Sequence, residues 1–230
     1  MNLEYKPLLR GALLTVLTLF GGLFIGLVSG DLVFHLIPGS SLTDVKLGHA
    51  AIAAIPAFAG FLAGGAAWGM QMGRLAGAYN PRRMAWAGTL GFGPITVALA
   101  AGLGVAEPFL VARLSAAGQP IHRAFTLLFV PSAFLIAGVS AWAIGKGLRD
   151  DRLAWSLLWR VGSVAAAAFL AVNLIMESLG WVVGAPGAAE RATMVTVLAI
   201  GNICAALLGG AMMGWCLTSN RKRFVKPDFI

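Results

Sequence analysis

Three residues near the amino terminus have side chains of the kind that binds metal ions: Asp31, His35 and His49. Asp31 and His35 are four positions apart, so on a helix they would share one face. His49 begins the next apolar stretch, and a helical hairpin would bring it to the same end of the protein. A carboxylate with two imidazoles can bind zinc, copper or non-haem iron, and an open coordination position would allow catalysis or transfer. The simpler alternative, which the sequence favours, is that each histidine lies at a membrane interface and hydrogen-bonds a loop carbonyl or water.

The pattern Asp-x3-His-x13-His resembles the copper-ligand pattern in the C subunit of the particulate methane and ammonia monooxygenases. There an acidic or amide residue and a histidine end one membrane helix, and a second histidine begins the next. The resemblance covers only Asp31, His35 and His49, and it implies that these three would be copper ligands. Further along the chain, Glu107 and His122 offer a partial second set, which makes His122 an additional candidate ligand. A haem or pigment on one histidine ranks lower, because no two histidines are placed to clamp a haem near mid-membrane.

Other polar residues lie within or at the ends of apolar stretches. Asp31, Glu107 and Glu177 end alternate stretches, and ionisable groups at membrane depth mark functional sites because they are costly there. We expect these carboxylates to ring a vestibule if their helices pack around a threefold axis; the alternative is that each lies in the hydrated headgroup region. Asn173 and Asn202 are intramembrane polar residues, and we expect Asn202 to hydrogen-bond between helices.

All of these residues belong to an unusually apolar chain. Of its 230 residues, 59% are hydrophobic and 11% are charged, and the mean hydropathy is +0.84. Soluble domains are about 45–50% apolar and about 25% charged, so the composition excludes a soluble fold and predicts the lipid bilayer as a partner. The net charge of +8 does not predict nucleic acid as a partner, because the basic residues flank apolar stretches and no nucleic-acid-binding motif is present.

Six apolar stretches are long enough to cross about 30 Å of hydrocarbon. Short polar segments with turn-forming residues separate them. We predict an all-α fold: a polytopic membrane bundle of six transmembrane helices that forms a single integral membrane domain over residues 1–230. The stretches are 11–30, 48–72, 84–106, 122–146, 154–180 and 193–217.

The basic residues predict the orientation. With the amino terminus inside, 13 of the 17 lysines and arginines fall on the inner side and 4 on the outer side. Cytoplasmic loops carry such an excess of basic residues. We therefore predict a multi-pass protein of the cytoplasmic (inner) membrane with both termini in the cytoplasm, and a basic carboxy-terminal tail, 221–230, that fixes the orientation of the last helix.

One motif recurs along the chain: a small residue, two further positions, a second small residue and then a tryptophan. Trp68, Trp142 and Trp215 are separated by 74 and 73 residues, which is the length of one helical hairpin. This period predicts three hairpin repeats in a pseudo-threefold arrangement. We expect the small residues to let helices approach closely, and the tryptophans to anchor the inner headgroup region. The repeats span approximately 1–77, 78–150 and 151–220.

These features predict a non-enzymatic carrier or channel, or a membrane subunit of a larger complex or homo-oligomer. No nucleotide-binding motif is present, and nothing in the sequence identifies a substrate. One alternative is a membrane enzyme or metal-handling protein that uses copper or zinc at Asp31, His35 and His49. A second alternative is a haem- or pigment-binding electron-transfer subunit.

Overall fold

The computed structural model describes residues 5–36, 47–78, 80–118, 122–180 and 188–221. Within these ranges the chain is helical and contains no strand, which confirms the predicted all-α class. The first three elements follow one another without a break and form one rod, so the described chain makes six rods. In chain order the elements are α1 (Tyr5–Thr15), the π-helical segment η1 (Val16–Phe20), α2 (Gly21–Leu36), α3 (Leu47–Ala76), α4 (Pro81–Ala116), α5 (His122–Gly147), α6 (Asp151–Ser178) and α7 (Ala188–Ser219).

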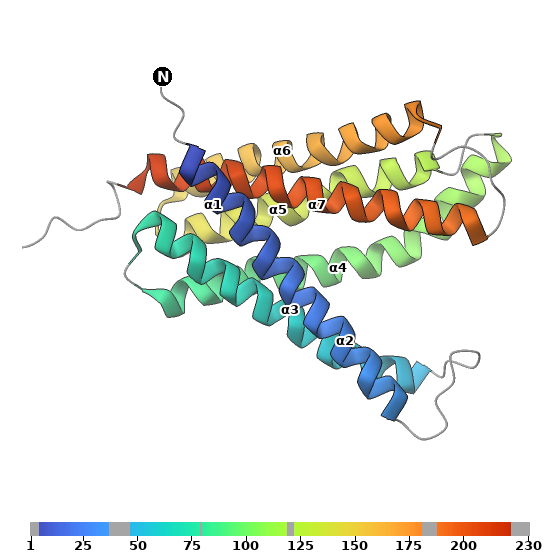
Figure 1. Cartoon of the computed structure of the whole chain (residues 1–230), viewed down its shortest axis with the longest axis horizontal. Coiled ribbons are helices and arrows are strands. Elements are labelled where there is room, and N and C mark those ends of the chain that lie inside the picture. The colour runs from blue at the N-terminus through green and yellow to red at the C-terminus, as the bar shows by residue number, and fades with distance from the viewer. Residues whose placement is uncertain (1–4, 37–46, 79, 119–121, 181–187, 222–230) are drawn as a thin grey trace, which may run out of the picture.

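The rods pack side by side in chain order (Figure 1). Each contacts the next, from α2 against α3 to α6 against α7, and α1 contacts α7, which closes a ring. Three alternate helices, α3, α5 and α7, also contact one another inside this ring. Figure 1 shows that α2 and the beginning of α3 diverge together from the other helices. The ring encloses an interior to which every rod contributes side chains.

Both ends of the described chain lie at one end of the bundle, together with the α3–α4 and α5–α6 turns (Figure 1). We call this the basic end, because most of the basic side chains that the structure describes belong to it. Arg113, in contrast, lies in the last turn of α4 at the opposite end. The basic side chains of the helix ends and turns at the basic end are Lys6, Arg10, Arg74, Arg82, Arg83, Lys146, Arg149, Arg152 and Arg221.

The α3–α4 turn has the hydrogen bonds of a glycine-terminated helix. Gly77 has a φ of 77°, and the N–H of Ala78 donates to the carbonyl of Gly73 at 2.8 Å. Glycine suits this position because it adopts a positive φ without steric cost. The next helix is capped by Asn80, whose side-chain oxygen accepts from the N–H of Arg83 at 3.0 Å. Local sequence therefore ends one helix and begins the next within a few residues.

The α5–α6 turn begins with the same type of backbone hydrogen bond and a positive φ, but with different residues. The N–H of Asp150 donates to the carbonyl of Gly145 at 3.2 Å, as Ala78 does in the first turn. Arg149 occupies the place of Gly77 and has a φ of 60°. Asp150 caps α6 by accepting from the N–H of Leu153 at 2.8 Å. Both turns therefore end their first helix with a residue of positive φ and the same type of backbone hydrogen bond, although Asp150 also caps the next helix whereas Asn80 does so in the α3–α4 turn.

Small residues bring neighbouring helices into close contact, as the sequence predicts. Gly60 and Gly64 of α3 face Gly22 of α2, and Gly214 of α7 faces Gly11 of α1. A Cβ atom at Gly60 or Gly214 would overlap backbone atoms of the facing helix. Close van der Waals packing drives helix association in lipid, where the hydrophobic effect between helices is absent. The predicted role of the small residues is confirmed at these contacts.

Four segments of the described chain are long and apolar enough to cross a membrane. They support a membrane protein whose helices contact lipid. Each of the six stretches predicted from the sequence lies within a rod, apart from residues 179–180 at the end of the fifth stretch, although several rods extend well beyond the predicted bounds. Six crossings and a threefold repeat go beyond these four segments and stay predictions. The segments are Tyr5–Gly26, Thr126–Gly147, Asp151–Ser178 and Thr196–Ser219.

Candidate functional site

The predicted metal ligands lie on two helices that pack against each other. Asp31 and His35 are one turn apart on α2, and His49 lies in the first turn of α3. Their side chains lie outside the described part of the structure, as does that of His122, the first residue of α5. Among the side chains that are described, no group of three His, Cys, Asp or Glu residues could hold a metal ion. The metal site therefore stays a prediction.

Of the three carboxylates expected to ring a vestibule, only Glu177 has a described side chain. It is half-buried in the last turn of α6. The side chains of Asp31 and Glu107 lie outside the described part of the chain. The ring of carboxylates stays a prediction as well.

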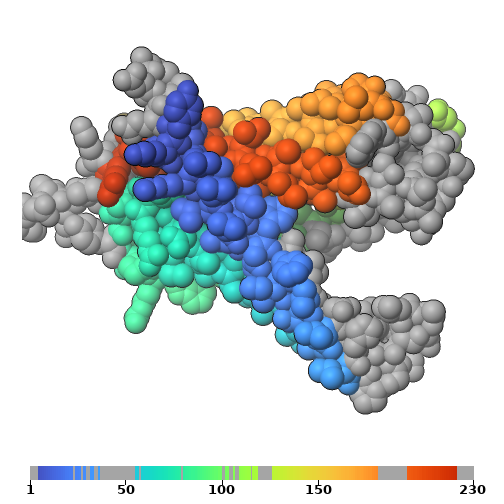
Figure 2. All heavy atoms as spheres, in the orientation of Figure 1, coloured from blue at the N-terminus to red at the C-terminus, as the bar shows by residue number. Residues whose placement is uncertain are grey.

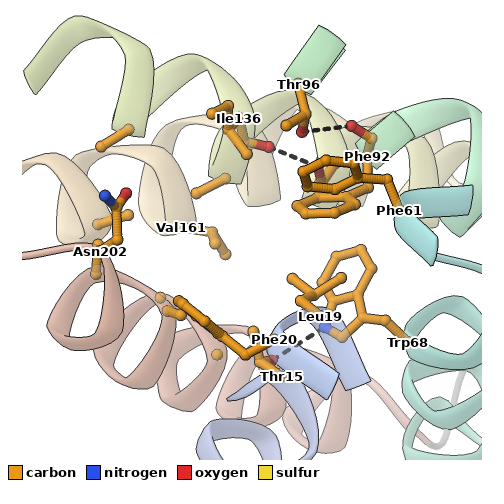
Figure 3. A pocket seen from close by; sticks show the side chains of 18 of the residues that line it. Thr15, Leu19, Phe20, Phe61, Trp68, Phe92, Thr96, Ile136, Val161 and Asn202 are labelled. Carbon is orange, nitrogen blue, oxygen red and sulfur yellow. Dashed lines mark hydrogen bonds between the residues drawn. The ribbon is translucent and has the colours of Figure 1, made fainter. Parts of the chain in front are cut away.

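The structure contains a cavity of about 410 Å³ inside the ring of helices. This volume is typical of small-ligand pockets, which span about 300–1,000 Å³. The residues around it come from every rod, so no local sequence motif marks it (Figure 3). They include Thr15 and Phe20 of the first rod, Phe61 and Trp68 of α3, Phe92 and Thr96 of α4, Ile136 and Ser140 of α5, Val161 and Ala165 of α6, and Asn202 and Gly209 of α7.

Two kinds of wall face this cavity. Phe61 and Phe92 form a tilted aromatic pair with ring centroids 6.0 Å apart, and Figure 3 shows Trp68 beside them. The wall from α6 and α7 consists mainly of alanine and glycine, such as Ala165 and Gly209. Aromatic rings opposite small residues leave a slot between them. This shape suits a ligand with an apolar body.

The first rod changes its helical winding beside the cavity. The π-helical segment η1 contributes Leu19 and Phe20 to the lining. The hydroxyl groups of Thr15 and Thr18 donate to carbonyls one turn earlier on the same rod, at 2.8 Å and 2.5 Å. Such back-bonding competes with the regular helical pattern and bends helices. Short π segments frequently occur at functional sites, and the threonines are the sequence signal for this one.

Trp68 lies inside the bundle rather than on its lipid-facing surface. Its side chain is 3% exposed, and its Nε1–H donates to the Thr15 hydroxyl at 3.0 Å. The predicted anchoring role is therefore wrong for this tryptophan. The reason is rotational: α3 contacts α1, α4 and α7, so a tryptophan on its inner face is buried. Trp215, in contrast, is 38% exposed.

The hydroxyl groups of the lining are hydrogen-bonded within the protein. Thr96 donates to the carbonyl of Phe92 at 2.6 Å. Ser140 lies 3.2 Å from the carbonyl of Gly91 on the neighbouring α4. Among the residues that line the cavity in the described structure, none is ionisable. The described lining is therefore uncharged, and its hydroxyl groups need no ligand to satisfy their donors.

The two intramembrane asparagines bond within their own helices. The Nδ2 of Asn202 donates to the carbonyl of Leu198, and that of Asn173 donates to Phe169, each at 2.8 Å. This bond uses one donor of Asn202, and the predicted hydrogen bond between helices stays a prediction. Figure 3 shows Asn202 across the cavity from Phe61 and Trp68. An amide has a second N–H and a carbonyl oxygen, so Asn202 can still bind one polar group of a ligand.

The cavity is closed toward the basic end and exposed farther along α7. Met72 of α3, Ile144 of α5, and Met213 and Leu217 of α7 form a cluster with 0% exposure just beyond the cavity. On the other side, the lining residue Asn202 is exposed. The geometry is that of a cup whose floor lies at the basic end.

Comparison of the chain with protein families, with curated proteins and with solved structures found no match.

Proposed function

We propose that this protein is a non-enzymatic integral membrane protein that binds an uncharged, largely apolar molecule in its central cavity, as a carrier or as the ligand-holding subunit of a complex. The observation that carries this proposal is the cavity lining, which comes from every rod and in the described structure includes no ionisable side chain. Ion pathways use rings of carbonyls or charged side chains. This lining offers aromatic and aliphatic surface instead.

The cavity volume limits the size of the molecule. A cavity of about 150 Å³ binds benzene, and scaling that volume to about 410 Å³ gives room for roughly 15 non-hydrogen atoms. Because the lining hydroxyls already donate to carbonyls of the protein, the ligand needs few polar groups. A hydrocarbon chain or fused ring with one neutral polar group, held near Asn202, fits these constraints.

The proposed topology places six rods across the cytoplasmic membrane with both termini in the cytoplasm. The basic end is then the inner end, and the cup faces the outer half of the bilayer. Three hairpins related by a pseudo-threefold axis agree with the closed ring, with the mutual contacts of α3, α5 and α7, and with the similar way in which α3 and α5 end. Cysteine-accessibility labelling of the two tails tests the orientation.

Binding of a neutral fluorophore tests the proposed function. The purified protein should bind a neutral anthracene derivative and should bind its carboxylate analogue at least tenfold more weakly, because burying a charge without a partner is costly. The variant Ala206→Leu fills the cavity and should abolish binding. Ala167→Leu adds the same volume on an exposed face of α6 and should bind like the parent. Equal binding by both variants, or equal binding of the anion, would refute the proposal.

A metal site formed by Asp31, His35 and His49 is a second proposal. It is favoured by the packing of α2 against α3, which carry these residues. Metal analysis of the purified protein beside His35→Ala tests it. Equal, near-zero metal content in both proteins would exclude it without affecting the cavity.

A further inference from the structure

The α3–α4 turn concentrates positive charge. Arg74 lies in the last turn of α3, and Arg82 and Arg83 lie in the first turn of α4, which contains no acidic residue. The amino-terminal end of a helix carries a partial positive charge of its own. Two arginines at this end therefore repel the helix dipole as well as each other. An anion bound at the turn would relieve this repulsion.

Arg83 is positioned with one donor unused. Its backbone N–H is held by the Asn80 side chain at 3.0 Å, and the next residue, Met84, is 1% exposed. The Nε of Arg83 is shielded from solvent and has no hydrogen-bond partner in the part of the chain that the structure describes. A shielded guanidinium donor without an acceptor is unfavourable. Among the described residues, the α3–α4 turn therefore lacks a hydrogen-bond acceptor for the Arg83 Nε–H as well as a negative charge.

The α5–α6 turn, which begins with the same type of helix ending, supplies its own anions. Asp150 caps α6 and Asp151 lies in its first turn. Lys146 pairs with Asp151 at 2.7 Å. Carboxylates at a helix amino terminus are stabilising, so this turn is compensated within the protein. Of these two turns, only the α3–α4 turn lacks an anion of its own among the described residues.

The surroundings indicate a lipid as the source of that anion. Trp86 lies one turn beyond Arg82 on α4 and is 65% exposed. Exposed tryptophans next to basic residues are typical of the headgroup level of a bilayer. Arginine binds phosphate oxygens through several N–H groups at once. We infer that Arg74, Arg82 and Arg83 bind the phosphate of an anionic phospholipid headgroup, with Trp86 against the lipid.

Lipid retention by the full-length protein tests this inference. Detergent-purified protein is mixed with phosphatidylglycerol or phosphatidylcholine, and bound lipid is measured by native mass spectrometry. Phosphatidylglycerol should be retained preferentially. Arg83→Gln and Arg82→Gln should each weaken its retention about fivefold, the factor that corresponds to about 1 kcal/mol per arginine. Arg149→Gln, at the matched turn, should change it less than twofold.

Three outcomes would overturn the inference: equal retention of the two lipids, an equal loss in Arg149→Gln, or full competition by millimolar inorganic phosphate, which would assign the site to a free anion. Size-exclusion profiles check that each variant is folded. If Arg83→Gln does not fold, Arg82→Gln carries the same test, because Arg82 is exposed. Binding of the neutral fluorophore in the cavity should be unchanged in the arginine variants, so this inference and the proposed function can fail separately.

Discussion

The basic end and the cavity level of the bundle are built from the same helices with side chains of different size. At the basic end, Met72, Ile144 and Met213 fill the space between α3, α5 and α7, each with 0% exposure. Farther along, α5 and α7 present small residues such as Ala137 and Gly210, and about 410 Å³ stays open. Figure 2 shows α1 crossing one face of the bundle between α7 and α3. The difference shows that large side chains on the inner helices close the basic end, whereas small side chains farther along leave the cavity open.

The largest effect is expected where backbones touch at the basic end. A Cβ atom at Gly69 would overlap the carbonyl oxygen of Met84 on α4. Gly69→Leu should therefore lower the free energy of unfolding by about 3 kcal/mol or more, because α3 and α4 must separate. Gly102→Leu is the control, since a Cβ at Gly102 of α4 meets nothing within 4 Å. Equal denaturation curves for the two variants would show that this end is not tightly packed.

The next largest effect is expected when a side chain of the cavity floor is truncated. Met213→Ala removes a side chain with 0% exposure and should cost about 2 kcal/mol of stability while enlarging the cavity. The variant should accept a longer neutral ligand than the parent does, which a chain-length series of alcohols measures. Leu208→Ala, at a position that is 52% exposed, should change neither property. If Met213→Ala preferred ligands of the same length as the parent does, Met213 would not form the floor of the cavity.

The hydrogen bond between the first rod and α3 tests the cavity wall. Thr15→Val keeps the shape but leaves the Trp68 Nε1–H without its acceptor, and this should cost about 1 kcal/mol. Tryptophan emission should shift as well, because Trp68 loses its polar partner. Thr18→Val removes a hydroxyl that donates to the carbonyl of Leu14 and should leave the emission unchanged. The same shift in both variants would contradict the assigned contact.

The smallest effect concerns the two turns at the basic end. Arg149 has the positive φ that Gly77 has in the matched turn. Arg149→Gly should raise the free energy of unfolding by about 0.5–1 kcal/mol, since glycine adopts this conformation without strain. The melting temperature should rise slightly as a result. Gly77→Ala should lower stability by a similar amount. A loss of stability in Arg149→Gly would mean that its side chain holds the turn more strongly than its backbone strains it.

The sequence predicts the helical rods well, because lipid leaves the backbone few alternatives to helices. All six apolar stretches fall on rods, and the turns follow from local residues such as Gly77 and Asp150. The close contacts at Gly60 and Gly214 were also predictable, since small residues spaced along apolar helices indicate interfaces. These features depend on local composition.

The cavity could not be predicted, because it is the volume left between residues from six rods. The depth of Trp68 along its helix suggested a headgroup position, but its burial depends on how α3 is rotated. The π segment η1 had only Thr15 and Thr18 as a signal. Each miss concerns rotation or packing, which a single sequence does not specify.

Photo-crosslinking in native membranes with a neutral long-chain alcohol that carries a diazirine tests the binding function most directly. We expect label on cavity residues of α3, α4 and α7, such as Phe61, Phe92 and Ala206. Ala206→Leu should remove this label, whereas Ala167→Leu should keep it. Label confined to exposed outer positions such as Leu208, and unaffected by Ala206→Leu, would contradict a ligand-binding cavity.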